Sequence, residues 1–232
     1  MKGIFDPDNP VVRGIAKFGY IWYLNLLWLV TSLPIFTIGA STTALIYSCS
    51  KLHDNSGYPT KNFFSAFKSN FKQSTAIWGI YGGTGVLILL DFVVWHRIDK
   101  SSITTGIMIA IALFWVATIL WVFAIQSKFV NTVKDTLHYT VLIACRHFKE
   151  TILMVVTVGA VGYLNIMYSA AVNFVTLAFG IGAIAYLFTV FYANTLDTYI
   201  KHSSESDEDE EDYDPKEADL AMDALVESLK KQ

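Results

Sequence analysis

Five apolar stretches, separated by polar segments, run along this chain of 232 residues. A transmembrane helix needs about 20 predominantly apolar residues to cross the hydrocarbon core. Residues 152–195 contain no charged residue, yet they are too many for one crossing, so a turn near 168–173 is predicted. The pattern predicts spans at about 18–38, 75–95, 103–125, 152–169 and 174–195.

Two further segments, 61–73 and 128–149, repeat apolar positions with the period of a helix but are too polar to span. In the first, the phenylalanines fall on one side of the helix and the lysines lie beside them. Aromatic rings next to lysines are typical of a helix that rests on an anionic membrane surface, and the same face would also serve to dock a partner. The candidate lipid or partner contacts are Lys61, Phe64, Phe67, Lys68, Phe71 and Lys72.

The composition agrees with a membrane protein. Hydrophobic residues make up 53% of the chain and charged residues 16%, against about 25% charged in soluble domains. Residues 201–232 hold 12 of the 20 acidic residues, so we expect a largely disordered acidic tail. The charge-poor body excludes an ordinary soluble enzyme, and two cysteines exclude a secreted disulfide scaffold. The predicted fold is all-α: a polytopic membrane helix bundle of about five transmembrane helices plus two cytoplasmic amphipathic helices.

The distribution of lysine and arginine predicts the orientation. With five spans, the side that receives 51–74, 126–150 and the start of the tail carries nine basic residues, and the opposite side carries five. Cytoplasmic segments carry an excess of lysine and arginine. We therefore expect both amphipathic helices and the C-terminus in the cytoplasm and the N-terminus outside.

The sequence carries none of the common catalytic signatures. Walker A, Gly-x-Ser-x-Gly, His-Glu-x-x-His and Cys-x-x-Cys patterns are all absent. We therefore expect no enzyme, no cofactor and no metal, and the slightly acidic net charge of −3 argues against a nucleic-acid partner. Two cysteines and two histidines are the one set that resembles zinc ligands, but nothing in their spacing forces them together: Cys49, His53, His138 and Cys145.

Polar residues within apolar spans are candidates for function, because burying them in a membrane is costly. The candidates are Asn25, Asn165 and Asn194. Their amides would either tie helices together or line a path for a small solute, and we favour the tie. The Gly79-x-x-x-Gly83 motif predicts close helix contact, within the chain or between two copies in a homo-oligomer.

Several motifs resemble one bacterial family. The most specific is Asn-Leu-Leu-Trp followed by Ser-Leu-Pro-Ile-Phe-Thr-Ile-Gly-Ala-Ser-Thr-Thr-Ala-Leu, and shorter matches lie elsewhere. The matching segments are 5–10, 25–28, 32–45, 64–75 and 129–131. They resemble YesL-like membrane proteins, a family catalogued as a domain of unknown function. The resemblance covers about residues 1–200 and leaves the acidic tail outside.

This resemblance implies a multi-pass protein of the bacterial plasma membrane, with no family active site to carry over. Genes of such proteins commonly lie beside those for carbohydrate ABC transporters and sugar-utilisation regulators. The implied partners are the lipid bilayer and components of such a transporter. The expected function is that of an integral membrane accessory protein in carbohydrate transport. A small-solute permease and a membrane scaffold without ligand are the alternatives.

Overall fold

The computed structural model describes residues 10–98, 101–129, 132–168 and 170–207, and every regular element in these ranges is helical. A 3₁₀ turn at Ile35–Thr37 and a π-helical turn at Thr176–Gly180 interrupt the α-helices. This confirms the all-α membrane fold. The helices are α1 (Pro10–Thr31), α2 (Ile38–His53), α3 (Pro59–Ile98), α4 (Ser102–Lys128), α5 (Val133–Arg146), α6 (Phe148–Met167), α7 (Ala170–Val175) and α8 (Ile181–Asp207).

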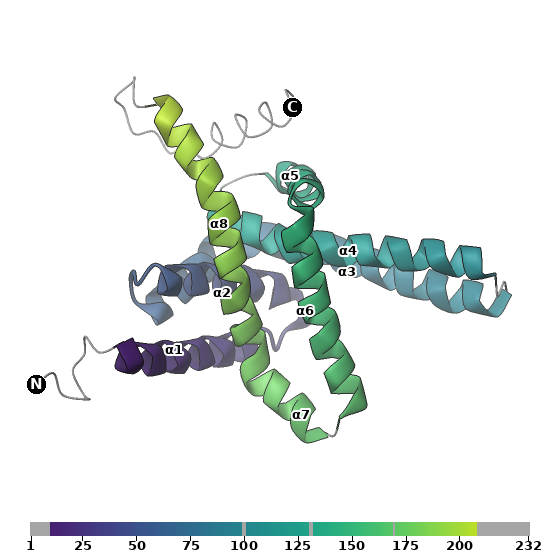
Figure 1. The fold of residues 1–232 in the computed structure, drawn as a ribbon, viewed down its shortest axis with the longest axis horizontal. Coiled ribbons are helices and arrows are strands. Elements are labelled where there is room, and N and C mark those ends of the chain that lie inside the picture. The colour runs from purple at the N-terminus through teal and green to yellow at the C-terminus, as the bar shows by residue number, and fades with distance from the viewer. Residues whose placement is uncertain (1–9, 99–100, 130–131, 169, 208–232) are drawn as a thin grey trace, which may run out of the picture.

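The long helices form two antiparallel hairpins that run in different directions (Figure 1). In this view the α3–α4 hairpin is horizontal. Helix α6 runs from top to bottom, and the chain then returns upwards through α7 and α8. Near their meeting point, α2 packs against α1, α3, α4 and α8. Of its 16 residues 11 are buried, which makes α2 the central element of the fold.

Among the residues that the structure describes, four helices are long and apolar enough to cross a membrane, which agrees roughly with the expected five. These candidate spans are Pro59–Trp95, Ser102–Lys128, Phe148–Met167 and Val172–Ala193. The difference lies at the first predicted span, 18–38, which is not a single helix. There α1 ends at Thr31, because Pro34 has no N–H for a helical hydrogen bond and disfavours helical geometry in the residue before it.

The two amphipathic segments also differ from their predicted bounds. Segment 61–73 is not separate from the span after it, because α3 continues without a break for 40 residues and contains no glycine or proline between Pro59 and Gly79. The second amphipathic helix, α5, is shorter than the predicted 128–149. Its first residue follows Thr132, whose side chain accepts a hydrogen bond from the backbone N–H of Asp135 as an N-cap.

The last hairpin turns at the predicted position, but its final helix is longer than predicted. The chain leaves α6 at Tyr168, within the predicted turn at 168–173. Helix α8 continues to Asp207, into the segment expected to be a disordered tail. The rest of the acidic tail, 208–232, lies outside the described residues.

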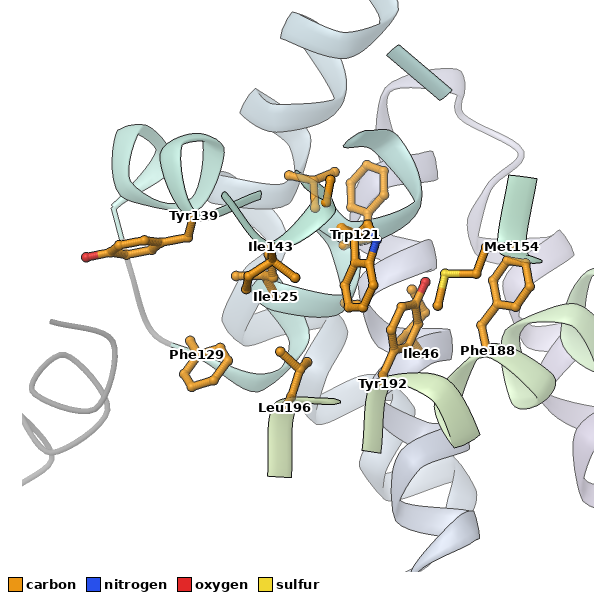
Figure 2. Close-up of a cluster of buried hydrophobic side chains, with 14 of the residues drawn as sticks. Ile46, Trp121, Ile125, Phe129, Tyr139, Ile143, Met154, Phe188, Tyr192 and Leu196 are labelled. Atoms are coloured by element: carbon orange, nitrogen blue, oxygen red, sulfur yellow. The ribbon is translucent and has the colours of Figure 1, made fainter. Parts of the chain in front are cut away.

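A buried hydrophobic cluster joins the two hairpins (Figure 2). Trp121 of α4 is fully buried at its centre, between Ile125 and the side chains of Met154 and Tyr192. Its indole N–H donates to the Thr151 hydroxyl over 2.9 Å, and the Tyr192 hydroxyl donates to the carbonyl of Leu120 over 2.6 Å. Apolar contact and satisfied polar atoms thus hold α4, α6 and α8 together.

Away from this junction the hairpins expose large apolar side chains, among them Leu89 (67% exposed), Ile103 (77%) and Ile166 (79%). Water would make such surfaces costly, whereas lipid tails accept them. The exposed apolar helices therefore indicate contact with a bilayer.

A close helix crossing lies at Gly39 and not at the predicted Gly79-x-x-x-Gly83 motif. A Cβ at Gly39 would lie 2.3 Å from the Ser74 carbonyl oxygen and 2.6 Å from the Cβ of Trp78, so only glycine lets α2 approach α3 here. A Cβ at Gly79 or Gly83 would meet no atom of another described element within 4 Å. Within the described chain, the motif makes no close helix contact.

Replacing Gly39 by alanine should therefore destabilise the protein more than replacing Gly83 by alanine. The new methyl group at Gly39 forces backbone to shift, which typically costs about 1–3 kcal/mol, while an exposed helical position changes stability by about 0.5 kcal/mol or less. The melting temperatures of the two purified variants in the same detergent measure this. A larger loss at Gly83 would show that its face is buried, for example between two copies.

Candidate functional site

One candidate site is the contact between Asn25 of α1 and the π-helical turn before α8. Asn25 is fully buried, and its Nδ2 donates to the carbonyl oxygens of Leu177 (3.0 Å) and Ala178 (2.8 Å). Its Oδ1 accepts the backbone N–H of Gly182 over 2.7 Å. A π-helical turn breaks the regular hydrogen-bond ladder of a helix. One side chain therefore satisfies backbone groups within this turn and at the start of α8.

Glycine at position 182 makes this contact geometrically feasible. A Cβ there would lie 2.9 Å from both the Cβ of Asn25 and the carbonyl oxygen of Ile21. The backbones of α1 and α8 approach closely at this point, as small residues permit in membrane helix pairs.

The second predicted asparagine, Asn165 of α6, reaches the same π-helical turn from another helix. Its Nδ2 donates to the Val161 carbonyl oxygen in its own helix (2.8 Å) and to the Thr176 hydroxyl (3.2 Å). The structure thus brings two of the three predicted asparagines to one turn. The side chain of Asn194 lies outside the described part of the chain. The contacts of Asn25 and Asn165 are those of helix ties.

A second candidate site is the lysine face, which we define as Lys61, Phe64 and Lys68 near the start of α3. With Tyr58, Thr60 and Ser65 these side chains border a shallow, open cavity of about 480 Å³. All three residues of the lysine face are exposed. An exposed ring between two ammonium groups gives this surface both apolar and electrostatic binding capacity.

The other predicted contacts of this helix lie outside that cavity. Lys72 is exposed further along α3, whereas Phe67 and Phe71 are half-buried and contact each other with ring centroids 5.4 Å apart. Phe67 also stacks on Phe63, which is fully buried against α2. The row of phenylalanines expected at the lipid surface therefore turns partly into the protein, because α2 covers one side of α3.

A buried amide cluster, which the sequence analysis missed, joins α3, α4 and α5. Gln126 is only 1% exposed, and its Nε2 donates to the side-chain oxygens of Asn70 (3.1 Å) and Gln73 (2.9 Å). Its Oε1 accepts the Thr136 hydroxyl over 3.2 Å. A partly polar cavity of about 290 Å³ lies beside this cluster. Two features of the sequence could have indicated this cluster. Gln126 lies just beyond an uncharged span, and Asn70 and Gln73 lie within a motif that resembles the family.

The cysteines occupy different environments. Cys49 is buried in α2, and burial raises the pKa of its thiol to about 12, whereas Cys145 is exposed on α5. The described residues contain no group of three or more His, Cys, Asp or Glu side chains able to hold a metal ion.

The fold and these sites define a polytopic helical membrane protein whose buried polar groups tie helices and whose cations lie on exposed faces. A family model described as "Protein of unknown function, DUF624" matches residues 21–92, which include Asn25, the lysine face and Gly39. The chain is also 26% identical over 147 residues to the uncharacterized protein YesL of Bacillus subtilis (strain 168), a match that covers 61% of this chain and 69% of YesL. No solved structure matches the chain. These matches confirm the resemblance of this chain to YesL-like proteins and to the DUF624 family.

Replacing Asn25 by alanine should lower the melting temperature clearly, because two carbonyl groups and one N–H lose their buried partner. A buried polar group without a partner costs about 1–3 kcal/mol. The matched control is Asn173→Ala, at an exposed position of α7, which should change little. Equal stability of the two variants in a thermal melt would contradict the role of Asn25 as a helix tie.

Proposed function

We propose that this chain is an integral membrane accessory protein of carbohydrate uptake, which docks a cytoplasmic component of an ABC transporter through its lysine face. The observation that carries this proposal is the exposed cavity bordered by Lys61, Phe64 and Lys68. It lies on a helix that is held along one side by α2, so the surface is preformed. Preformed surfaces bind at a lower entropic cost than mobile ones.

The gene neighbourhoods implied by the family resemblance support the choice of partner. The chemistry of the face supports a partner surface that combines acidic groups with an apolar anchor, because charge complementarity steers docking and a buried ring contributes affinity.

A small-solute permease is the second candidate, and the cavity beside Gln126 favours it. Amide and hydroxyl groups near that cavity would accept a small polar solute. The two asparagines oppose it, since the amide groups of Asn25 and Asn165 are engaged with neighbouring helix atoms. Solute flux through the purified chain in proteoliposomes would favour the permease over the accessory role. A scaffold without ligand would show neither flux nor a copurifying transporter.

The double variant Lys61→Gln/Lys68→Gln tests the docking face. Recovery of the ABC transporter components with the tagged chain from native membranes should fall by about tenfold, the effect of losing one or two charge-assisted contacts. Protein level and melting temperature should stay normal because both lysines are exposed. Lys72→Gln, on the same helix but outside the cavity, is the matched control and should retain the partner. Normal recovery with the double variant would refute docking at this face.

We also propose that the N-terminal region, α5 and the end of α8 share the cytoplasmic side. Because α1 does not qualify as a candidate span, the chain crosses four times, and four crossings place these three segments on the same side of the membrane. Segments 1–74 and 126–150 together with Lys201 then carry 12 basic residues, and the loop at 96–101 on the opposite side carries 2. This differs from the five-span expectation in the location of the N-terminus.

Native and introduced cysteines test this topology. A membrane-impermeant maleimide should label Cys145 only after the cells are permeabilised. Cys49 should stay unlabelled, because it is buried and its raised pKa leaves little reactive thiolate. In a Cys145→Ser background, Gly14→Cys places an exposed thiol on α1, where a Cβ meets no neighbour. Four crossings predict protection of both thiols in intact cells, whereas labelling of Gly14→Cys alone would establish a fifth crossing.

A further inference from the structure

A basic cleft lies between the first turns of α1 and the turn that connects α2 to α3. Its volume is about 520 Å³, and α1 contributes Arg13, Lys17 and Tyr20 to its wall. The opposite wall contains Asn55 and Asn62. Both segments lie at the same end of the molecule (Figure 1). This cleft is separate from the lysine face, although the two adjoin at Tyr58.

The two cations of the cleft occupy positions that do not stabilise their own helix. Arg13 lies in the first turn of α1, where the helix dipole favours negative charge, and that turn contains no acidic residue. Lys17 follows one turn later, and like charges at this spacing repel each other. No acidic side chain is among the described residues that line the cleft. Both cations border the cleft from α1, so the cleft presents two positive side chains to a group that enters it.

The opposite wall supplies neutral donors on a well-defined backbone. Asn55 and Gly57 adopt positive φ angles of 54° and 72°, and a Cβ on Gly57 would lie 2.8 Å from the side-chain nitrogen of Asn62. Asn62 donates to the Ser56 carbonyl oxygen over 3.3 Å, which holds it against the turn. A guanidinium, an ammonium and amide groups around one space are the donor set that proteins use for phosphate oxygens.

We propose that this cleft binds a phosphate group. Two sources supply that chemistry: a water-soluble phosphate, such as a phosphate monoester, and the headgroup of an anionic phospholipid. The exposed apolar residues Ile15, Phe18 and Trp22 lie on the face of α1 opposite Arg13 and Lys17, by the helical period. A lipid layer that covers those residues would leave the cleft turned towards water. The geometry therefore favours the water-soluble phosphate.

The first experiment titrates the purified full-length chain, in a neutral detergent, with inorganic phosphate and with glycerol 3-phosphate by calorimetry. Sodium chloride at equal ionic strength controls for screening. The Arg13→Gln/Lys17→Gln variant should bind at least about tenfold more weakly than the unmodified chain. The matched variant Lys134→Gln/Lys149→Gln removes two exposed cations elsewhere and should bind within about twofold of the unmodified chain.

The second arm distinguishes the two sources. Nanodiscs of phosphatidylcholine should leave phosphate binding intact. If nanodiscs that contain phosphatidylglycerol abolish phosphate binding in the unmodified chain, the headgroup is the occupant and the phosphate site still stands. Ser56→Glu adds a carboxylate to an exposed position of the turn, and it should weaken phosphate binding while the melting temperature without phosphate stays unchanged.

Three results would overturn the proposal. They are equal binding by both double variants, undiminished binding by Ser56→Glu, and no binding of either phosphate compound or of phosphatidylglycerol by the unmodified chain. None of these measurements involves a partner protein, so they do not depend on the docking function of the lysine face.

Discussion

The close crossing of α2 over α3 sets the arrangement of the helices that pack around α2. At Gly39 the two backbones approach so closely that a methyl group would collide with the Ser74 carbonyl oxygen, and Thr43 forms a hydrogen bond with the Ser74 hydroxyl over 2.9 Å. Small residues along α2 permit this approach, and hydroxyls of α2 bond back to carbonyl oxygens one turn earlier. The hydroxyls of Thr42, Thr43 and Ser48 are therefore satisfied, whereas the hydroxyl of Ser41 in the same helix is buried without a hydrogen-bond partner.

This crossing also positions the surfaces that we assign to function. With α2 against one side of α3, Phe63 is buried, while Lys61, Phe64 and Lys68 remain exposed around one cavity. The turn that links the two helices then becomes a wall of the basic cleft. The two surfaces adjoin at Tyr58, so a protein partner and a phosphate would bind side by side. Their separate sets of cations allow each to be tested without disturbing the other.

The buried amides show how polar residues serve structure in an apolar setting. Asn25 bonds to a π-helical turn about 150 residues away, and Gln126 holds two side chains of α3 and one of α5. In a medium of low dielectric constant, an unpaired amide is costly, so each buried amide here defines which helices must meet. Such contacts specify an arrangement that apolar packing alone would leave open, because lipid tails compete with apolar side chains.

Local composition predicts the helical membrane class, the apolar stretches within α4, α6 and α8, and the turn near Tyr168, because these depend on the residues of one segment and on breaks in an apolar run. The remaining features depend on how the helices pack against one another. By the helical period, Phe63 lies on the same side of α3 as the exposed Phe64 and the half-buried Phe67. Its complete burial follows only from the position of α2. Asn25 and Gln126 bond to residues far away in the chain, and Arg13 and Asn62, also far apart, line one cleft. A local pattern carries no information about such pairs, since the closing of long loops and the fit of whole helices decide which distant side chains meet.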